Sequence, residues 1–158
     1  MPCIAPCAWQ TLEDVEAIAE RFPHELSGGM RQRVLIAIAI AKQPDLIIAD
    51  EPTTALDATV QARVLKTLGD AVSDLGTSLI LISHDIAVVA AMTDRICVMY
   101  GGVVVETGPT DQVLHDPQHP YTRALLRSVR SLTDAEVDLY SIPPALRRSI
   151  AEEVAHAS

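Results

Sequence analysis

The chain has 158 residues, of which 49% are hydrophobic and only 3% aromatic, and its formal net charge is −9. This length suggests one domain with an aliphatic core of Ala, Val, Ile and Leu. The acidic balance disfavours general binding to nucleic acid or to an anionic membrane surface. No apolar run approaches the roughly 18 to 20 residues that span a bilayer, so we expect no transmembrane helix.

The N-terminal segment carries two cysteines, Cys3 and Cys7, but no further metal ligands beside them. We interpret both as unconstrained residues rather than as a metal site. The segment has no basic start and no long apolar stretch, so no signal peptide is predicted. A helix is predicted over residues 11–22, ended by Pro23. Cys97, in an apolar pattern, is interpreted as a small core residue.

Helices and strands are then predicted in alternation. Ser27 is placed to cap a helix over residues 28–42, and an apolar, buried strand follows over residues 46–49. Asp57 is placed to cap a helix over residues 58–75 that ends at Gly76. Further along we expect a strand over 78–83, a helix over 86–92, a hairpin over 95–107 that turns at Gly101-Gly102, and a helix over 110–114 capped by Thr110. This alternation predicts an α/β fold with a mainly parallel sheet.

The character of the chain changes near residue 115. Residues 115–121 are polar and rich in proline, like a linker, and a helix is predicted over residues 121–130. We therefore expect two parts, residues 1–115 and residues 116–158.

The start of the first of these α/β helices is a candidate anion site. Ser27, Gly28 and Gly29 would present free backbone N–H groups at the positive end of the helix dipole. Glycines let the backbone approach a phosphate closely. For this segment alone, an ordinary capped helix is the alternative interpretation.

Two acids stand at the carboxyl end of the first strand, where α/β proteins bind ligands. Phosphoryl transfer needs Mg²⁺ and a group that orients the attacking water. We assign Asp50 to the metal and Glu51 to the role of general base. His84 ends the next strand, so it is aimed at the same edge and could donate to a phosphate oxygen. A solvated acidic pair and a structural histidine are the alternatives.

In order and spacing, these motifs resemble those of ATP-binding cassette (ABC) ATPases. Residues 26–30 are similar to the signature, residues 46–51 to Walker B, Ala55-Leu56-Asp57 to the D-loop and His84 to the switch histidine. The resemblance implies a truncated P-loop NTPase domain with a signature helix. It also implies that Ser27, Gly28, Gly29 and Asp57 bind ATP, with Mg²⁺, in a site shared with a partner subunit.

The C-terminal segment resembles a helical extension found on the ATPases of oligopeptide, dipeptide and nickel importers. The resemblance is carried by residues 119–125, and Met30 in the signature is a variant typical of peptide importers. Some relatives hold an iron–sulfur cluster in this extension. Residues 115–158 contain no cysteine, so we expect no such cluster here.

No Gly-x-x-x-x-Gly-Lys-Ser/Thr loop (Walker A) and no Q-loop precede residue 26. Residues 1–115 therefore resemble a partial nucleotide-binding domain, and we expect weak ATP binding by this chain alone and exposed apolar strand edges. Whether the chain acts as an ATPase stays open at this stage.

The resemblance implies an ATP-binding subunit at the cytoplasmic face of the cell membrane. Such a subunit couples ATP hydrolysis to uptake of peptides or related small solutes. Its expected partners are a second ABC ATPase subunit, in a homo- or heterodimer, transmembrane permease subunits and, indirectly, a solute-binding protein, but not nucleic acid. Two alternatives are a non-catalytic fragment that supplies only its signature face to an intact ATPase, and an inactive truncated gene product.

Overall fold

The computed structural model of the chain describes residues 18, 20–133 and 148. Cys3, Cys7, most of the helix predicted over residues 11–22 and most of the C-terminal tail lie outside the described residues. The chain forms two compact units that divide between His84 and Asp85. The domain boundary predicted near residue 115 falls within the second unit, and it stays a prediction.

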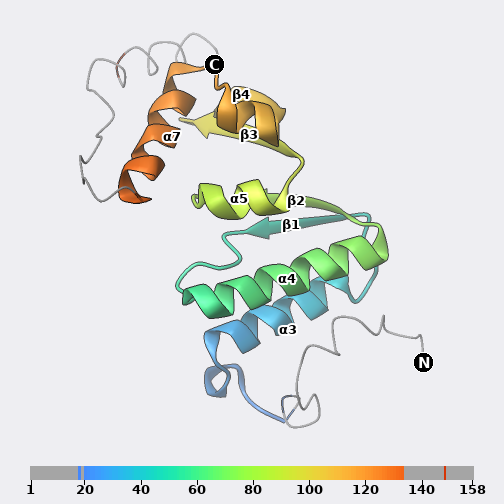
Figure 1. Cartoon of the computed structure of the whole chain (residues 1–158). Coiled ribbons are helices and arrows are strands. Elements are labelled where there is room, and N and C mark those ends of the chain that lie inside the picture. Colours follow the sequence, from blue (N-terminus) through green and yellow to red (C-terminus); the bar gives the residue numbers. More distant parts are fainter. Residues whose placement is uncertain (1–17, 19, 134–147, 149–158) are drawn as a thin grey trace. The chain divides into compact units, whose positions relative to one another are not determined.

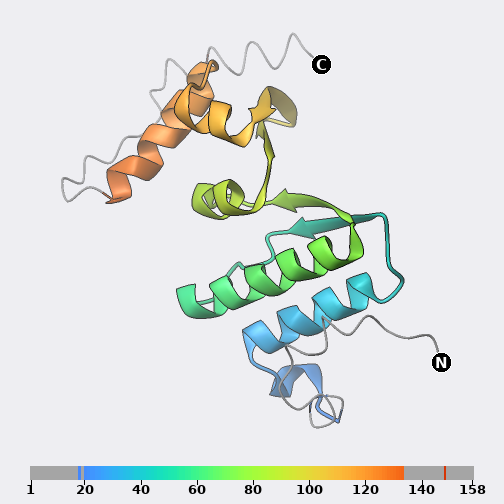
Figure 2. The ribbon, with the colours of Figure 1, turned by 45° about the vertical axis from the view of Figure 1, so that its right-hand side comes forward.

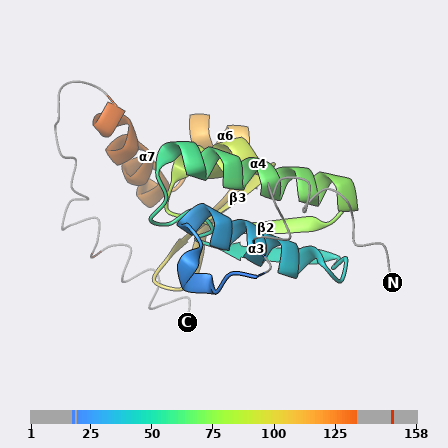
Figure 3. The same ribbon diagram turned by 90° about the horizontal axis from the view of Figure 1, so that it is seen from below.

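The first unit contains a parallel pair of strands and two long helices (Figure 1). Strands β1 and β2 pair in register, with Leu46 opposite Ser78 and Asp50 opposite Ile82. Helices α3 and α4 lie side by side on one face of this pair, as Figures 1 and 3 both show. In order, the elements are η1 (Pro23–Glu25), α3 (Gly28–Ile40), β1 (Leu46–Asp50), α4 (Ala58–Leu75) and β2 (Ser78–Ile82).

Local signals set the ends of the two helices. The side chain of Ser27 accepts a hydrogen bond from the Met30 N–H at 3.3 Å, which confirms it as the cap of α3. Asp57 Oδ1 accepts from the N–H groups of Thr59 and Val60 at 3.1 and 3.0 Å and so caps α4. Gly76 ends α4 with a φ of +61°, which favours glycine. The predicted bounds of α4 are confirmed, whereas α3 ends two residues earlier than predicted.

The core of the first unit lies between the sheet and the two helices. Its side chains are aliphatic, as the composition indicated, and come from β1, α3 and α4: Ile36, Ala37, Ile40, Ile47, Val64, Leu68 and Ala71.

The other face of the sheet is open in this unit. Ile48 is 62% exposed, and Leu46, Ile80 and Ile82 are each close to half exposed. The prediction of fully buried strands was therefore wrong for this face. The reason is that α3 and α4 both cover the same face of the sheet. Successive strand residues point to opposite faces, so every second side chain points to the face that these helices leave uncovered.

In its described residues, the second unit contains an antiparallel hairpin and helices α5, α6 and α7 (Figures 1 and 2). β3 and β4 pair across Gly101 and Gly102, whose φ values of +56° and +85° fit the predicted hairpin turn. Cys97 is exposed on β3, so its assignment to the core was wrong. The elements are α5 (Ile86–Met92), β3 (Arg95–Tyr100), β4 (Val103–Pro109), α6 (Thr110–His115) and α7 (Pro120–Thr133).

Thr110 is not the cap of α6, as we had expected, but its first residue. Its hydroxyl donates instead to the carbonyl oxygen of Thr93 at 2.7 Å. A tertiary hydrogen bond therefore takes the side chain that the local pattern assigned to a cap.

Contacts from the first turn of α7 and from the two residues before it hold this helix against the hairpin. The carboxylate of Glu106 on β4 accepts from the N–H groups of Gln118 and His119 at 2.7 and 3.1 Å. The rings of Tyr100 and Tyr121 pack with their centroids 4.8 Å apart. The segment that resembles the importer extension therefore also holds α7 against the hairpin of β3 and β4.

Candidate functional site

The candidate site begins where β1 ends. Glu51 follows the strand directly, and its N–H donates to the carbonyl oxygen of Ile82 at 2.9 Å, which extends the pairing with β2 by one step. Its φ of +48° is uncommon for a residue with a side chain. Such conformations persist where the surroundings hold them, and they gather at functional sites. Here the turn directs the carboxylate toward the end of β2.

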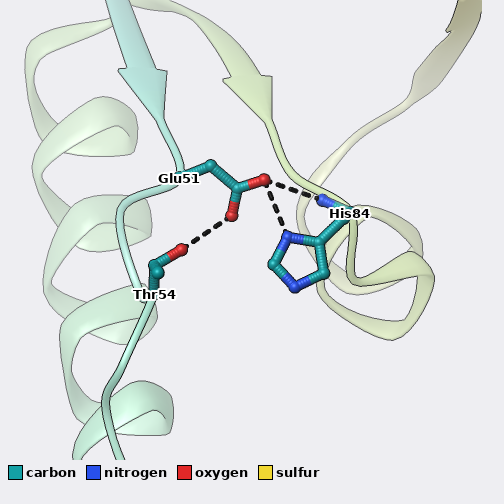
Figure 4. A network of polar contacts seen from close by, with 3 residues as sticks. All are labelled: Glu51, Thr54 and His84. Carbon is teal, nitrogen blue, oxygen red and sulfur yellow. Dashed lines mark hydrogen bonds and ion pairs between the residues drawn. The ribbon is translucent and has the colours of Figure 1, made fainter.

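The carboxylate of Glu51 joins two segments (Figure 4). Its Oε1 atom accepts from the backbone N–H of His84 at 3.2 Å and lies 2.8 Å from His84 Nδ1. Because an ionised carboxylate only accepts hydrogen bonds, Nδ1 carries a proton in this contact. Its Oε2 atom accepts from the Thr54 hydroxyl at 2.8 Å. The structure therefore brings together the two residues that the sequence assigned to catalysis.

Hydrogen bonding lowers the pKa of Glu51. The largest cause is the bond with the His84 side chain, followed by the bond from the Thr54 hydroxyl. These contacts favour the charged form. Glu51 is 37% exposed and His84 79% exposed in their side chains, so both remain accessible to a ligand. The pair presents an anionic acceptor beside an imidazole at the edge of the sheet.

Asp50 is the last residue of β1 and is exposed. It is one of the residues that line a groove of about 200 Å³ between α3 and β1, whose lining is otherwise mainly apolar. The described residues hold no group of three or more His, Cys, Asp or Glu side chains suited to a metal. Mg²⁺ is commonly held by one or two carboxylates together with phosphates and water. Asp50 and Glu51 therefore fit part of a Mg²⁺–nucleotide site and would need the nucleotide to complete it.

The signature residues form a second group, around the start of α3. Gly29 is buried, and a Cβ atom there would lie 2.3 Å from Val60 Cγ1. A Cβ at Gly28 would lie 2.9 Å from Leu56 Cδ2. Gly29 thus permits the close packing of α3 against α4, whereas the end of the flexible Leu56 side chain could move away from a Cβ at Gly28; sequence reasoning missed this packing role. Asp57, assigned to ATP binding, serves here as the cap of α4.

The two groups share one side of the unit. Helices α3 and α4 both begin on the side toward which β1 points (Figure 1). The contacts of Gly28 and Gly29 run to Leu56 and Val60, whereas those of Glu51 run to Thr54 and His84. Sequence reasoning passed over Thr54. A hydroxyl three residues after the acid is within reach only across a tight turn, and the sequence does not mark the left-handed backbone of Glu51 on which that turn depends.

Comparisons with known proteins place these observations in a family. Residues 8–54 match the family model described as ABC transporter, and residues 105–154 match the one described as oligopeptide/dipeptide transporter, C-terminal region. The first match includes the signature and Walker B segments. The second includes Glu106 and the start of α7.

Curated relatives agree with both family models. The chain is 53% identical over 129 residues to an oligopeptide transport ATP-binding protein of Bacillus subtilis, a match that covers 81% of this chain and 36% of the relative. It is 51% identical over 140 residues to the Lactococcus lactis subsp. cremoris protein of the same description, covering 85% and 41%. A glutathione import ATP-binding protein of Escherichia coli K12 is 51% identical over 121 residues, covering 77% and 19%. The chain thus spans well under half the length of these relatives.

A solved structure supports the fold. The dimeric, post-hydrolysis structure of an ATP-binding cassette bound to ADP and Pi matches with a TM-score of 0.56 and 34% identity, covering 66% of this chain and 44% of that one. The fold class predicted from sequence, that of an ABC ATPase domain, is confirmed. With the two family models and relatives more than 50% identical, the chain belongs to the ABC transporter family, among its ATP-binding proteins of the oligopeptide/dipeptide type.

Proposed function

We propose that this chain serves in the ATP-binding subunit of an importer that couples ATP hydrolysis to uptake of peptides or related small solutes. The observation that carries the proposal is the Glu51–His84 pair at the end of the parallel strands. The relatives are import ATP-binding proteins for oligopeptides and glutathione, which supports this solute class. The two alternatives, a signature-only fragment and an inactive product, gain no support from these relatives.

In this proposal each residue at the sheet edge has one task. The Glu51 carboxylate orients a water molecule and accepts its proton. His84 stands beside it; because its Nδ1 already donates to Glu51, it donates to a phosphate oxygen through Nε2, as the doubly protonated imidazolium. Asp50 contributes a carboxylate oxygen toward Mg²⁺ which, when bound, neutralises charge on the phosphates.

The signature group acts toward a second nucleotide. Ser27, Gly28 and Gly29 start a helix of 13 residues, whose N-terminus favours anions. We place this end, with Asp57, against ATP that is bound mainly by a partner ATPase subunit. The dimeric state of the matched ATP-binding cassette supports such an arrangement.

We further propose that the subunit works at the cytoplasmic face of the membrane, bound to permease subunits and through them to a solute-binding protein. Within the described part of the chain, no helix is long and apolar enough to cross a bilayer.

ATP hydrolysis in the assembled importer tests the proposal. The chain, its partner ATPase and the permease are reconstituted in vesicles, and turnover is compared between wild type, Glu51→Gln and a matched control, Asp74→Asn, an exposed carboxylate on α4. General-base catalysis contributes roughly 10²- to 10⁴-fold, so Glu51→Gln should remove most of the turnover at this site. The control should be unchanged.

Two outcomes would contradict the proposal. If Glu51→Gln hydrolyses ATP as fast as Asp74→Asn, the sheet edge is not the catalytic centre. If Glu51→Gln is neutral but Ser27→Arg abolishes turnover, the chain supplies only its signature face to the partner's ATP.

A further inference from the structure

We propose that Thr54 is a positioning residue for Glu51: its hydroxyl holds the carboxylate so that one acceptor position on Oε2 faces the attacking water. This inference rests on the proposed function, and it assigns a role to a residue outside the motif positions discussed so far. Thr54 contacts the proposed base through its hydroxyl, so the role we assign to it acts through Glu51.

The acceptor positions of the carboxylate carry the argument. A carboxylate has two oxygens with about four lone-pair positions. Oε1 accepts twice from His84, through the backbone N–H at 3.2 Å and the ring at 2.8 Å. Oε2 accepts once, from the Thr54 hydroxyl at 2.8 Å. The position that remains for water is therefore on Oε2, the oxygen that Thr54 holds (Figure 4).

The end of a glutamate side chain is otherwise poorly fixed. Rotation of its terminal carboxylate is broad, without the sharp wells of other torsions. Within the described residues, Thr54 makes the one side-chain hydrogen bond recorded to Oε2. Without it, the carboxylate could pivot on its His84 contacts, and the remaining acceptor position would move with it.

The turn prepares the hydroxyl for this task. The Thr54 N–H donates to the Glu51 carbonyl oxygen at 3.2 Å, which sets the backbone of the two residues at a fixed separation. Positive φ values at Glu51 and Ala55, +48° and +62°, bracket the turn, and Pro52 and Thr53 anchor it in the interior. A β-branched side chain has few rotamers at χ1, so little freedom is lost in the bond.

Because the Thr54 side chain is exposed, a role in catalysis can be tested separately from a role in stability. The side chain of Thr54 lies at the surface. Its hydroxyl can therefore be removed without opening the core, so folding and catalysis can be tested apart.

The experiment compares three variants in the assembled importer. Thr54→Val keeps the shape and loses the hydroxyl, Thr54→Ser keeps the hydroxyl and loses the methyl, and Thr107→Val removes an exposed hydroxyl from β4 as the control. We expect Thr54→Val to lower kcat on the order of tenfold, with the KM for ATP within about twofold, because a misplaced base slows chemistry more than binding. Thr54→Ser and the control should match wild type.

Each contrary result is informative. If Thr54→Val keeps the wild-type kcat while Glu51→Gln is inactive, Thr54 has no positioning role although the proposed function stands. If Thr54→Ser loses as much as Thr54→Val, the methyl and not the hydroxyl matters, and the inference is wrong. If Glu51→Gln is fully active, the proposed function fails, and this inference with it. Equal unfolding midpoints for all variants verify that each is folded, and Thr54→Ala repeats the test if the valine variant is unstable.

Discussion

Substitution of Gly29 by alanine tests the packing between the signature helix and α4. The new Cβ would lie 2.3 Å from Val60 Cγ1, whereas ordinary contacts between carbon atoms begin near 3.4 Å. One of the two methyl groups must therefore move by about 1 Å. Val60 is β-branched and stiff at χ1, so a rotamer change gives little relief. Helices α3 and α4 would have to separate at this point.

The magnitude follows from two opposing terms. Overpacking of a well-packed contact typically costs about 1 to 3 kcal/mol. Alanine recovers up to about 1 kcal/mol over glycine through its better helix propensity. We expect Gly29→Ala to lower the free energy of unfolding by about 1 to 2 kcal/mol, measured by urea denaturation of the purified chain.

A double-mutant cycle with Val60→Ala isolates the contact. That substitution removes the clashing methyl, so Gly29→Ala/Val60→Ala should be at least about 1 kcal/mol more stable than the sum of the single effects predicts. Val72→Ala is the matched control, because Val72 lies on the same helix about 18 Å from Val60 and should add without coupling. If Gly29→Ala is as stable as wild type, or if the double mutant is merely additive, the close approach described here is not present in solution.

Substitutions at three further residues, Ser27, Gly76 and Glu106, test the helix ends and the attachment of α7. Ser27→Ala should cost about 0.5 to 1 kcal/mol of unfolding free energy, at the low end for a cap because its bond to Met30 is long, 3.3 Å, and chemical denaturation measures it. Gly76→Ala should cost about 1 kcal/mol in the same assay, since φ is +61° there although a Cβ would meet no atom, and Gly76→Asn should cost less. Burial raises the pKa of Glu106, but the backbone N–H groups of Gln118 and His119, which donate to its carboxylate, help to hold the pKa below its ordinary value of 4.5. The stabilisation is therefore complete above pH 4.5 and is lost as the pH falls through the folded value, so Glu106→Gln should flatten the acid limb of a stability–pH curve, and an unchanged limb would contradict the assignment.

Local signals in the sequence correctly predicted the helix ends at which they stand. Asp57 and Gly76 fixed both ends of α4, because a side-chain cap and a left-handed residue act within a few residues of the helix. The prediction that Thr110 caps α6 was wrong because its side chain has a partner outside the local sequence. Its competing partner, the carbonyl oxygen of Thr93, is distant in sequence and belongs to the tertiary structure.

Burial was harder to predict than secondary structure. The apolar run around Ile48 indicated a strand, and it is one, but whether both faces of a strand are covered depends on the layers above it. The prediction that Cys97 lies in the core was wrong for the same reason, since strand periodicity alone does not say which face of the strand meets the core.

The contact between Glu51 and His84, the pair proposed for catalysis, could be predicted from topology, whereas the bond from Thr54 to Glu51 could not. Glu51 and His84 follow the carboxyl ends of neighbouring parallel strands, which necessarily meet at one edge. The bond from Thr54 depends on the left-handed backbone of Glu51, for which the sequence carries no local signal of the kind that glycine gives.

The register of two short strands ultimately sets the geometry of the site. Asp50 pairs with Ile82, so the next residue on one strand and the second on the other, Glu51 and His84, come within hydrogen-bonding distance. A slip of one residue would turn every side chain of β1 to the opposite face and separate this pair. What opposes the slip is the burial of Ile47 against α3 and α4, because its neighbours Leu46 and Ile48 on the open face offer little resistance. The placement of the proposed base therefore depends on one apolar side chain in the core as much as on the polar contacts around it.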